Sequence, residues 1–306
     1  MEKLVTIVMP CYNMGKYIQQ ALDSVGVQTY TKWEIIAVED LGIKDGTEDI
    51  VLKFAKKHKY QSIQFITSTE NRGVSAARNT AIKQAKGAFI ALLDPDDYWA
   101  SDHLEKAINH FNSDPELYFY SSFAYLLNHD SPLKSVGIEG YVDWEMKAFP
   151  YILSIRNAIP ASSAVLRTKV FDSVQLFDED KEIQHVEDYD LWVRILEKNL
   201  KISINPEPTI YYRKHASAAT SNSKRMHIAK HSFAKKHKDW LVLYQREALE
   251  QLARKIFSLD EKICTLKLNI NSLVTRVSII EETIKKVKSM PIIRQLFYIK
   301  SKIFRG

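Results

Sequence analysis

The first hundred residues alternate short apolar runs with amphipathic helical patterns, and this alternation limits the possible fold more than any other feature. The apolar runs are Leu4–Met9, Trp33–Val38, Ile63–Thr67 and Ala88–Leu93, and the helical patterns between them are Tyr17–Val27, Glu48–His58 and Val74–Lys86. Continuous apolar strands separated by helices indicate βαβ units, whose parallel strands are buried on both faces. We therefore expect an α/β fold with a Rossmann-like, mostly parallel central sheet and flanking helices.

Polar clusters follow three of the four runs, at the positions where the strands would end. They are Tyr12-Asn13, Glu39-Asp40 and Asp94–Asp97. The carboxyl ends of parallel strands share one edge of a sheet, and the ligands of such sheets bind beyond that edge. We therefore expect the three clusters to meet in one crevice.

The third cluster places three carboxylates within four positions, at Asp94, Asp96 and Asp97. Like charges at this spacing repel one another unless a cation or a donor-rich ligand shares the site. Carboxylates suit a hard divalent metal that carries phosphates. The alternative is a solvated turn with an aspartate that caps the next helix.

The middle of the chain is less regular. Leu117–Leu127 is rich in aromatic residues and predicts a strand. The segment from Gln184 to Asp190 opens a clear amphipathic helix at Leu191–Leu200, and Tyr211-Tyr212-Arg213-Lys214-His215 follows a short predicted strand.

A heptad repeat replaces these patterns in the last sixty residues. Its a positions are Leu249, Ile256, Ile263, Ile270, Val277 and Ile284, and its d positions are Leu252, Leu259, Leu266, Leu273, Ile280 and Val287. β-Branched residues at a with mostly leucine at d favour a parallel two-stranded coiled coil, and hence a homodimer. As a helix the repeat would span about 58 Å. The alternative is a helix that lies on its own domain, which normally shows a wider apolar stripe.

The positive charge is concentrated at the C-terminus. The net charge of the chain is +6, and residues 224–306 alone carry 19 Lys+Arg against 7 Asp+Glu. Residues 292–305 also have an apolar side and four cations mainly opposite it, which is typical of a helix at a membrane surface; docking on the protein itself is the alternative. An anionic membrane surface is thus a candidate partner. We expect no nucleic acid, because no stacking or groove-reading motif accompanies the charge.

The compartment follows from what the chain contains. Leu4–Met9 is too short and too weakly flanked for a signal peptide, and no apolar run approaches the ~20 residues of a membrane span. Cys11 and Cys264 lie far apart and suggest no disulfide framework, which fits a reducing cytosol. We expect a cytoplasmic protein, peripheral at the inner face of the cytoplasmic membrane.

Taken together, these patterns predict four segments. They are an α/β domain at 1–223, a helical linker at 224–248, the parallel coiled coil at 249–288 and a basic amphipathic helix at 289–306.

The motifs of the first 220 residues, taken in order, resemble those of family 2 inverting glycosyltransferases with the GT-A fold. The matching segments are Val5–Asn13, Gln28–Tyr30, Trp33–Ile36, Val38–Asp40, Asp45–Thr47, Asn71–Asn79, Leu92–Trp99, Phe177–Glu179, Glu187–Trp192 and Tyr212–His215. Their order and spacing are specific, and the resemblance covers about residues 3–220.

The resemblance implies a nucleotide-sugar donor, a UDP-sugar by its pattern, and a divalent cation, Mn²⁺ or Mg²⁺. The cation neutralises the charge that develops on the diphosphate leaving group. Asp96, Asp97 and His215 are the implied metal ligands. Either aspartate could instead hold the donor ribose, and His215 could instead contact the diphosphate. Asp94 is expected to cap the strand end. His227, His231 and His237 lie in a basic helix, and we expect them to be solvated.

The resemblance also implies a donor pocket. Its residues are Pro10, Tyr12, Glu39, Asp40, Arg78 and Asp96, with Asp40 accepting the N3–H of uracil. The chain departs from the family pattern at Leu41–Lys44, which makes the segment before Asp45-Gly46 one residue longer. A helix-face ion pair is the alternative role for Arg78.

For catalysis, an inverting transfer needs one carboxylate base that takes the proton of the acceptor hydroxyl. Asp188 is the implied base, with Glu187 as the alternative or as its orienting partner; capping of the following helix is a further role for Asp188. Asn157–Ser163 and the Gln184-His185 loop are expected to contact the sugar and the acceptor.

The implied function is a metal-dependent transfer of a sugar to a hydroxyl of a growing bacterial surface glycan, or of a lipid-linked acceptor. A sugar nucleotidylyltransferase would need a Gly-rich, Lys/Arg-bearing loop after the first strand, which Cys11–Lys16 matches poorly. A coiled-coil scaffold with an inert GT-A head is the non-enzymatic alternative, and the set of Asp96, Asp97, Glu187, Asp188 and His215 argues against it.

Overall fold

The structure, a computed structural model, describes residues 2–128, 131–214 and 223–289. The chain divides into two units, Met1–Ala248 and Leu249–Gly306. The first contains the sheet and its helices, and the second contains the larger part of one long helix. His215 and residues 290–306 lie outside the described residues, so the predicted metal ligand and nearly all of the predicted basic helix lie there too.

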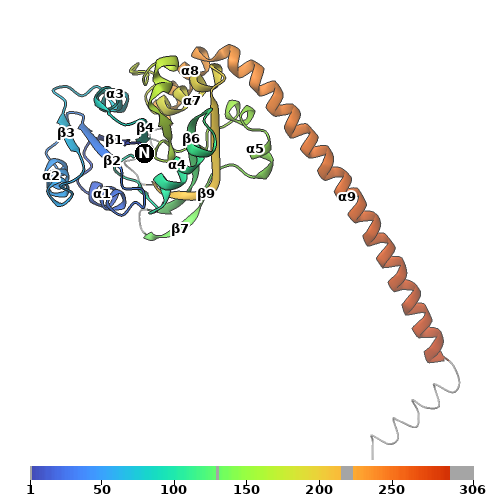
Figure 1. The fold of residues 1–306 in the computed structure, drawn as a ribbon. Coiled ribbons are helices and arrows are strands. Elements are labelled where there is room, and N and C mark those ends of the chain that lie inside the picture. The colour runs from blue at the N-terminus through green and yellow to red at the C-terminus, as the bar shows by residue number, and fades with distance from the viewer. Residues whose placement is uncertain (1, 129–130, 215–222, 290–306) are drawn as a thin grey trace, which may run out of the picture. The chain divides into compact units, whose positions relative to one another are not determined.

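A single sheet organises the first unit (Figure 1). Its strands in the described residues are β1 (Val5–Cys11), β2 (Trp33–Glu39), β3 (Ile63–Thr67), β4 (Phe89–Leu92), β5 (Tyr98–Trp99), β6 (Leu117–Asn128), β7 (Ser131–Glu139), β8 (Val165–Arg167) and β9 (Lys201–Lys214). Their order is β3-β2-β1-β4-β8-β6-β9-β5, with β7 paired to β6. Strands β3, β2, β1 and β4 are parallel, as predicted, and β6 pairs with β9 in parallel. The remaining pairs are antiparallel.

Helices cover both faces of the sheet. They are α1 (Ile18–Gly26), α2 (Thr47–Lys57), α3 (Val74–Gln84), α4 (His103–Ser113), α5 (Asp143–Lys147), α6 (Phe171–Val174), α7 (Glu187–Glu197), α8 (Ser223–Lys236) and α9 (Lys238–Ser289), with the short 3₁₀ segments η1 (Tyr151–Ser154), η2 (Ala161–Ser163) and η3 (Thr168–Val170). Neighbouring strand residues face opposite sides of the sheet. Ile7 and Ile35 pack with α1, α2 and α4, whereas Val8 and Ile36 pack with α3 and α7.

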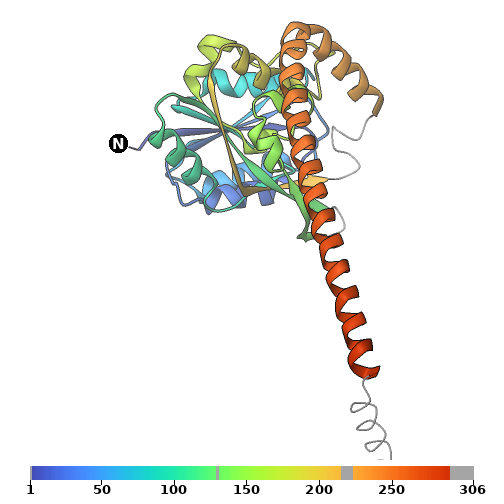
Figure 2. The same ribbon diagram turned by 90° about the vertical axis from the view of Figure 1, so that its right-hand side faces the viewer.

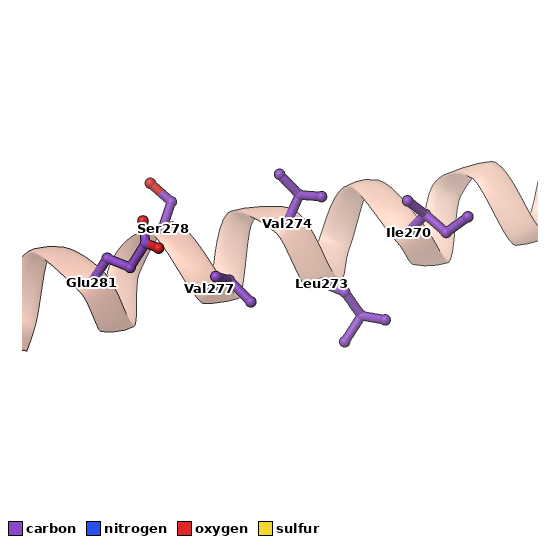
Figure 3. A pocket seen from close by; sticks show the side chains of 6 residues that line it. All are labelled: Ile270, Leu273, Val274, Val277, Ser278 and Glu281. Carbon is purple, nitrogen blue, oxygen red and sulfur yellow. The ribbon is translucent and has the colours of Figure 1, made fainter.

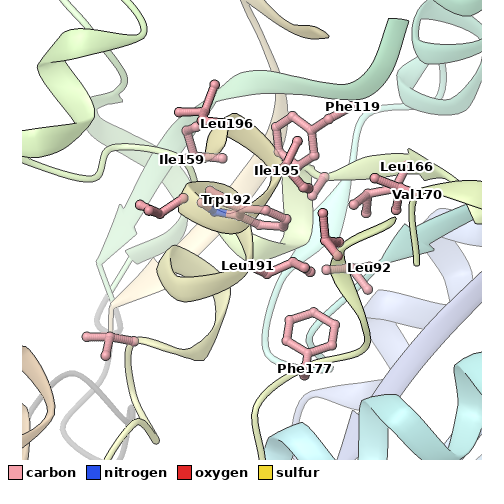
Figure 4. Packing of buried hydrophobic residues seen from close by; sticks show 14 of the residues in the cluster. Leu92, Phe119, Ile159, Leu166, Val170, Phe177, Leu191, Trp192, Ile195 and Leu196 are labelled. Carbon is pink, nitrogen blue, oxygen red and sulfur yellow. The ribbon is translucent and has the colours of Figure 1, made fainter. Parts of the chain in front are cut away.

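Helix α7 is anchored deep in the core (Figure 4). Trp192 is fully buried, and its ring centroid lies 4.5 Å from that of Phe119 on β6. Leu191 and Ile195 are also fully buried in the same cluster. Burial of several large side chains, each worth about 1.5–3 kcal/mol, holds the start of α7 at a fixed position relative to the sheet.

Residues 224–248, predicted from the sequence as a helical linker, fold against the sheet domain. Ala229 and Phe233 of α8 and Trp240 of α9 are buried in the cluster that also contains α7. The boundary between the two units falls after Ala248. The unit with the sheet therefore includes about 25 residues more than the predicted α/β domain.

The second unit contains the part of α9 that begins at Leu249 (Figure 2). The helix continues to Ser289, so the heptad positions from Leu249 to Val287 form one helix, as the pattern predicts. By length and composition alone, the stretch Lys238–Glu282 could cross a membrane, and it is the only such helix in the described ranges. No helix of this kind is expected from the sequence, in which no apolar run approaches the ~20 residues of a membrane span. One candidate of this kind is weak evidence for a span.

Candidate active site

The ends of β1, β2 and β4 bring the predicted polar clusters to one edge of the sheet. Val8 of β1 lies beside Ile36 of β2 and Leu92 of β4. At the end of β1, burial raises the pKa of the Cys11 thiol, and the nearby charges of Glu39, Asp45 and Asp94 raise it further. The carboxylates that follow β2 and β4 thus surround the end of β1, which confirms that the clusters converge.

Asp40 fixes the loop that leads into α3. It is buried, its Oδ1 accepts the N–H of Arg72 at 2.8 Å, and its Oδ2 accepts the N–H of Gly73 at 2.7 Å. Gly73 has φ +90°, and a Cβ there would lie 2.2 Å from Nε2 of Gln184. Each carboxylate oxygen of Asp40 keeps a second lone pair, so Asp40 can still accept the predicted hydrogen bond from the N3–H of uracil.

The longer segment Leu41–Lys44 is exposed and contacts both neighbouring loops. Ile43 N–H donates to Oδ1 of Asn13 at 2.9 Å, and Nδ2 of Asn71 donates to the carbonyl of Leu41 at 3.3 Å. Tyr12 beside it remains 46% exposed. An aromatic side chain is therefore accessible at the predicted base pocket, beside the longer segment.

The other two residues of that pocket lie in strands. Pro10 is buried in β1, and Glu39, the last residue of β2, is partly buried. Burial raises the pKa of Glu39, and the charges of Asp45 and Glu48 raise it further. Asp45 is held by Gly15 N–H at 2.6 Å and by the Thr47 hydroxyl at 2.7 Å, and these bonds lower its pKa against the opposing effect of burial.

The acidic turn after β4 is closed by Ser162 of η2. The Ser162 hydroxyl donates to Oδ2 of Asp97 at 2.6 Å and accepts the Asp94 N–H at 3.1 Å. Oδ1 of Asp97 accepts the N–H of Arg213 at 2.9 Å. Asp97 is buried, and its pKa is raised well above the ordinary value, first by burial and then by the charge of Asp96.

Two of the three predicted metal ligands lie within the described residues. Asp96 and Asp97 lie in the turn, whereas His215 is outside the described residues, and no group of three potential ligands occurs within the described ranges. Asp97 has one lone pair left on each oxygen. The charge of the turn suits a divalent cation. A nearby cation would favour the ionised form of Asp97, which burial and the charge of Asp96 disfavour.

Arg78 links the acidic turn to α7. It is 2% exposed, its Nη2 lies 2.7 Å from Oδ1 of Asp94, and its Nη1 lies 2.7 Å from Oε1 of Glu187. The guanidinium also lies over the ring of Phe177, 5.2 Å from its centroid. Burial alone would lower its pKa, but the two carboxylates outweigh that effect and raise it. Arg78 therefore forms ion pairs, as the alternative role predicted for it requires. A contact between Arg78 and the nucleotide-sugar stays a prediction.

Glu187 and Asp188 are the first two residues of α7, but their carboxylates differ. Glu187 is buried and uses both oxygens, one for Arg78 and the other for the His185 N–H at 2.8 Å. Asp188 is partly buried; desolvation first, and then the charge of Glu187, raises its pKa to about 7. Val186 precedes the helix, so Asp188 is not the N-cap residue. It lies in the first turn, where its Oδ1 accepts the Tyr189 N–H at 2.6 Å and its charge favours the helix dipole, in line with the further role expected for it.

Two residues of β9 also belong to this site; the family resemblance includes them in the segment Tyr212–His215 but implies no role for them. Burial raises the pKa of the Tyr212 hydroxyl, and the charges of Asp97, Asp96, Asp94 and Asp188 raise it further. Arg213 donates its backbone N–H to Asp97 and its Nε–H to the carbonyl of Asp96 at 2.9 Å. The only signal in the sequence was their position directly before His215.

The segments expected to contact the sugar and the acceptor border this site. Asn157–Ser163 includes Ser162, which holds the acidic turn. Gln184 donates to the carbonyl of Arg72 at 3.4 Å, and His185, with φ +81°, precedes the α7 residues. Both segments therefore lie next to candidate catalytic groups.

The expectation that His237 is solvated is wrong. His237 is buried, its Nε2 lies 2.8 Å from Oδ1 of Asp190, and its Nδ1 lies 3.0 Å from Oε1 of Glu197. Lys236 and Arg194 also pair with Asp190, at 2.6 and 2.8 Å. The cause is the packing of α8 onto α7, which puts a basic segment over the one buried aspartate of that face.

Two sequence profiles match this chain. Glycosyl transferase family 2 matches residues 6–167, which is more than half of the chain, and Glycosyl transferase family group 2 matches residues 89–260. Together the matches include the acidic turn, the start of α7, Tyr212 and Arg213.

Two curated relatives from Escherichia coli have named activities. The chain is 31% identical over 204 residues, 67% of its own length and 74% of the relative's, to the UDP-Glc:alpha-D-GlcNAc-diphosphoundecaprenol beta-1,3-glucosyltransferase WfgD. It is 29% identical over 265 residues, 85% of its own length and 98% of the relative's, to WfaP, a second UDP-Glc:alpha-D-GlcNAc-diphosphoundecaprenol beta-1,3-glucosyltransferase.

Solved structures share the fold at lower identity. Staphylococcus aureus TarS in complex with UDP-GlcNAc matches with a TM-score of 0.58 and 23% identity, over 72% of this chain and 61% of that one. The Pyrobaculum calidifontis mannosyltransferase PcManGT, in complex with GDP-Man and Mn²⁺, matches with a TM-score of 0.58 and 20% identity, over 83% and 75%. These matches confirm the predicted GT-A fold. The chain belongs to glycosyl transferase family 2 and is a glycosyltransferase.

Proposed function

We propose that this protein transfers a sugar from a UDP-sugar to a hydroxyl of a lipid-linked or growing bacterial surface glycan, with inversion at the anomeric carbon. The observation that carries the proposal is Asp188, a partly buried carboxyl at the start of α7 whose pKa of about 7 suits a general base. It lies near the acidic turn, because Arg78 joins Asp94 of that turn to Glu187, the residue next to Asp188. The activities of WfgD and WfaP support the choice of donor and acceptor.

In this proposal Asp188 accepts the proton of the acceptor hydroxyl while the oxygen forms a bond to C1 of the sugar. The bond from C1 to the diphosphate breaks in the same displacement, and UDP leaves with the bonding electron pair. Glu187 acts as a positioning residue, because Arg78 and the His185 N–H occupy both of its oxygens. Its negative charge favours the protonated form of Asp188 and so increases the basicity of that carboxylate.

On the donor side, Asp96 and Asp97, with His215, would hold a Mn²⁺ or Mg²⁺ ion. Such an ion supplies positive charge for the diphosphate leaving group. Asp40, Pro10, Tyr12 and Glu39 would form the pocket for the base, and the exposed ring of Tyr12 could stack on it.

The proposed location is the inner face of the cytoplasmic membrane, where a lipid-linked acceptor is accessible. Residues 289–306 would bind anionic lipid through their cations and apolar side. Flotation with vesicles that contain anionic lipid should retain the full chain and release a chain that ends at residue 288. Equal flotation of the two chains would refute this part of the proposal.

The proposed reaction is tested with a panel of UDP-sugars and a GlcNAc-diphospholipid acceptor, in Mn²⁺, Mg²⁺ or EDTA. We expect one transferred sugar by mass spectrometry and a β linkage from an α-linked donor by NMR. Binding of UDP without transfer to any acceptor in the panel would contradict the proposed acceptor class. Retention of the α configuration would contradict the proposed mechanism.

A further inference from the structure

The helix α9 carries an apolar stripe that no described residue of the second unit covers. From Ala253 to Glu282 every side chain whose exposure is described is exposed. The a and d residues Ile256, Leu259, Ile263, Leu266, Ile270, Leu273, Val277 and Ile280 are between 44% and 59% exposed. Figure 3 shows part of this stripe, where Ile270, Leu273 and Val277 project from the bare helix. Continuous apolar surface of this length marks an interaction site.

We infer that two copies of this chain pair through α9 as a parallel coiled coil in register, with each a and d residue beside its own counterpart. This adds an orientation and a register to the predicted homodimer and does not depend on the proposed reaction. The partner that covers the stripe is a second copy, because the apolar steps of three and four residues continue from Leu249 to Val287 and match those of an identical helix.

The charges beside the stripe favour the parallel orientation. In a parallel pair, each g residue faces the e residue five positions later in the partner. Lys255 then meets Asp260 and Arg276 meets Glu281, whereas Lys262 meets Lys267. Because each contact occurs on both sides of the dimer, attractive pairs outnumber repulsive pairs two to one.

An antiparallel pair would lose this complementarity. In that orientation g residues face g residues and e residues face e residues. At full overlap, with Leu266 opposite Ile270, Lys262 would meet Arg276 and Lys267 would meet its own counterpart. The charged contacts at that register join like charges, so the sequence disfavours it.

The outer face of α9 argues against a membrane as the partner. A helix surrounded by lipid is apolar on all sides. Here the positions opposite the stripe include Glu261, Asn271, Thr275 and Glu282, all exposed. A partner that covers one stripe and leaves the opposite face in water fits this distribution.

The test begins with two leucines that are alike in the single chain and differ in the dimer. Leu266 is a d residue and is 59% exposed, whereas Leu268 is on the outer face and is 65% exposed. By light scattering the full chain should have twice its mass of 35.3 kDa. Leu266→Ala should weaken self-association roughly 100-fold, because two leucines leave the interface, and Leu268→Ala should leave it unchanged. A monomeric full chain, or equal effects of the two substitutions, would overturn the inference.

Cysteine cross-linking then tests orientation in a Cys264→Ser background. Leu266→Cys should form a disulfide-linked dimer under mild oxidation, because parallel pairing in register brings the two Cβ atoms close together. Leu268→Cys is the control and should remain uncross-linked. If cross-links form only when the Leu266→Cys chain is mixed with an Ile270→Cys chain, the dimer is antiparallel and the proposed orientation is wrong.

A charge change separates the two orientations without cross-linking. Lys267→Glu converts the repulsive contacts with Lys262 into attractive ones in the parallel dimer, which should tighten it a few-fold in low salt. In the antiparallel dimer the same substitution replaces two opposing lysines with two opposing glutamates, so association should stay unchanged. Unchanged or weaker association of this variant would therefore contradict the parallel arrangement.

Discussion

The two faces of α7 hold aspartates whose pKa values are shifted in opposite directions. Asp188 faces the acidic site, where desolvation and the charge of Glu187 raise its pKa to about 7. Asp190 faces α8, where hydrogen bonding to His237 and the charges of Arg194 and Lys236 outweigh burial and lower its pKa to about 2. Residues two apart on a helix point about 200° away from each other, so one short sequence supplies both environments.

The comparison shows that burial alone does not decide the function of a carboxylate. Asp190 is fully buried, yet it is surrounded by cations and holds two helices together. Asp188 has other carboxylates as neighbours, and Arg78 only partly compensates for their charge. A carboxylate whose ionised form is disfavoured is the better proton acceptor, so the face that is less favourable for ionisation is the one suited to catalysis.

The largest expected effect comes from Asp188→Asn. The amide cannot accept the proton, so kcat/KM for sugar transfer should fall on the order of 10²–10⁴-fold, the usual contribution of a positioned general base. The free energy of unfolding should stay equal or rise, because the substitution removes a charge that the native state disfavours. Transfer assays and urea denaturation measure the two effects.

Asp172→Asn is the matched control, because Asp172 is an exposed aspartate in the first turn of α6. It should change neither quantity. If Asp188→Asn kept full activity, the two faces of α7 would not differ in function and the base would have to be sought elsewhere.

Arg78→Met should have the next largest effect. It leaves Asp94 and Glu187 without their shared cation, and loss of one partner of a buried ion pair costs about 3–5 kcal/mol. Because the charge of Arg78 lowers the pKa of Asp188, the pH dependence of transfer should also move to higher pH, which a purely structural role would not predict. Arg78→Lys should restore only part of the activity, since an ammonium cannot reproduce the two-pronged contact.

The control for this variant is Arg72→Met. Arg72 precedes the same helix but its side chain is 55% exposed where it pairs with Glu179, so its loss should cost less than about 1 kcal/mol. Equal effects of the two substitutions would show that burial of the Arg78 pairs has no special importance.

The sequence predicts features that depend on local pattern. The four parallel strands and the acidic turn after β4 follow from apolar runs and their polar ends, whereas α7 begins at Glu187, earlier than the helix predicted at Leu191–Leu200. The Asp190–His237 contact joins residues 47 positions apart, and α8 shows no strong amphipathic stripe from which its packing could be foreseen. Similarly, the two partners of Arg78 lie 16 and 109 positions away, and only the folded sheet brings them together.

Asp190→Asn tests the opposite face and should mainly reduce stability. We expect the free energy of unfolding to fall by about 2–3 kcal/mol at pH 7, because three cationic or ring N–H groups lose an ionised partner. The folded pKa of about 2 lies below the ordinary value of 3.8, so this stabilisation is present above about pH 4 and is lost as the pH falls toward 2. Sugar transfer should decrease less than tenfold.

Asp178→Asn is the control for that variant. Asp178 pairs with the same Lys236 at 2.6 Å, but its side chain is 29% exposed and the residue does not contact His237. We expect a loss below about 1 kcal/mol in urea denaturation. A loss as large as that of Asp190→Asn would mean that Lys236 alone, rather than the buried cluster, joins α8 to α7.

The smallest expected effect is the pH dependence of the native enzyme. It compares Asp188 with Asp190 without any substitution. The base must be ionised to accept the acceptor proton, and its pKa is about 7, so kcat/KM should be constant above about pH 8 and about tenfold lower at pH 6. Asp190 stays ionised over this range, so it should contribute nothing to the profile. The residual activity of Asp188→Asn should be independent of pH between 6 and 8. A native profile that stays flat down to pH 5 would mean that Asp188 is as acidic as an ordinary carboxyl, and that its face of α7 does not create the proposed base.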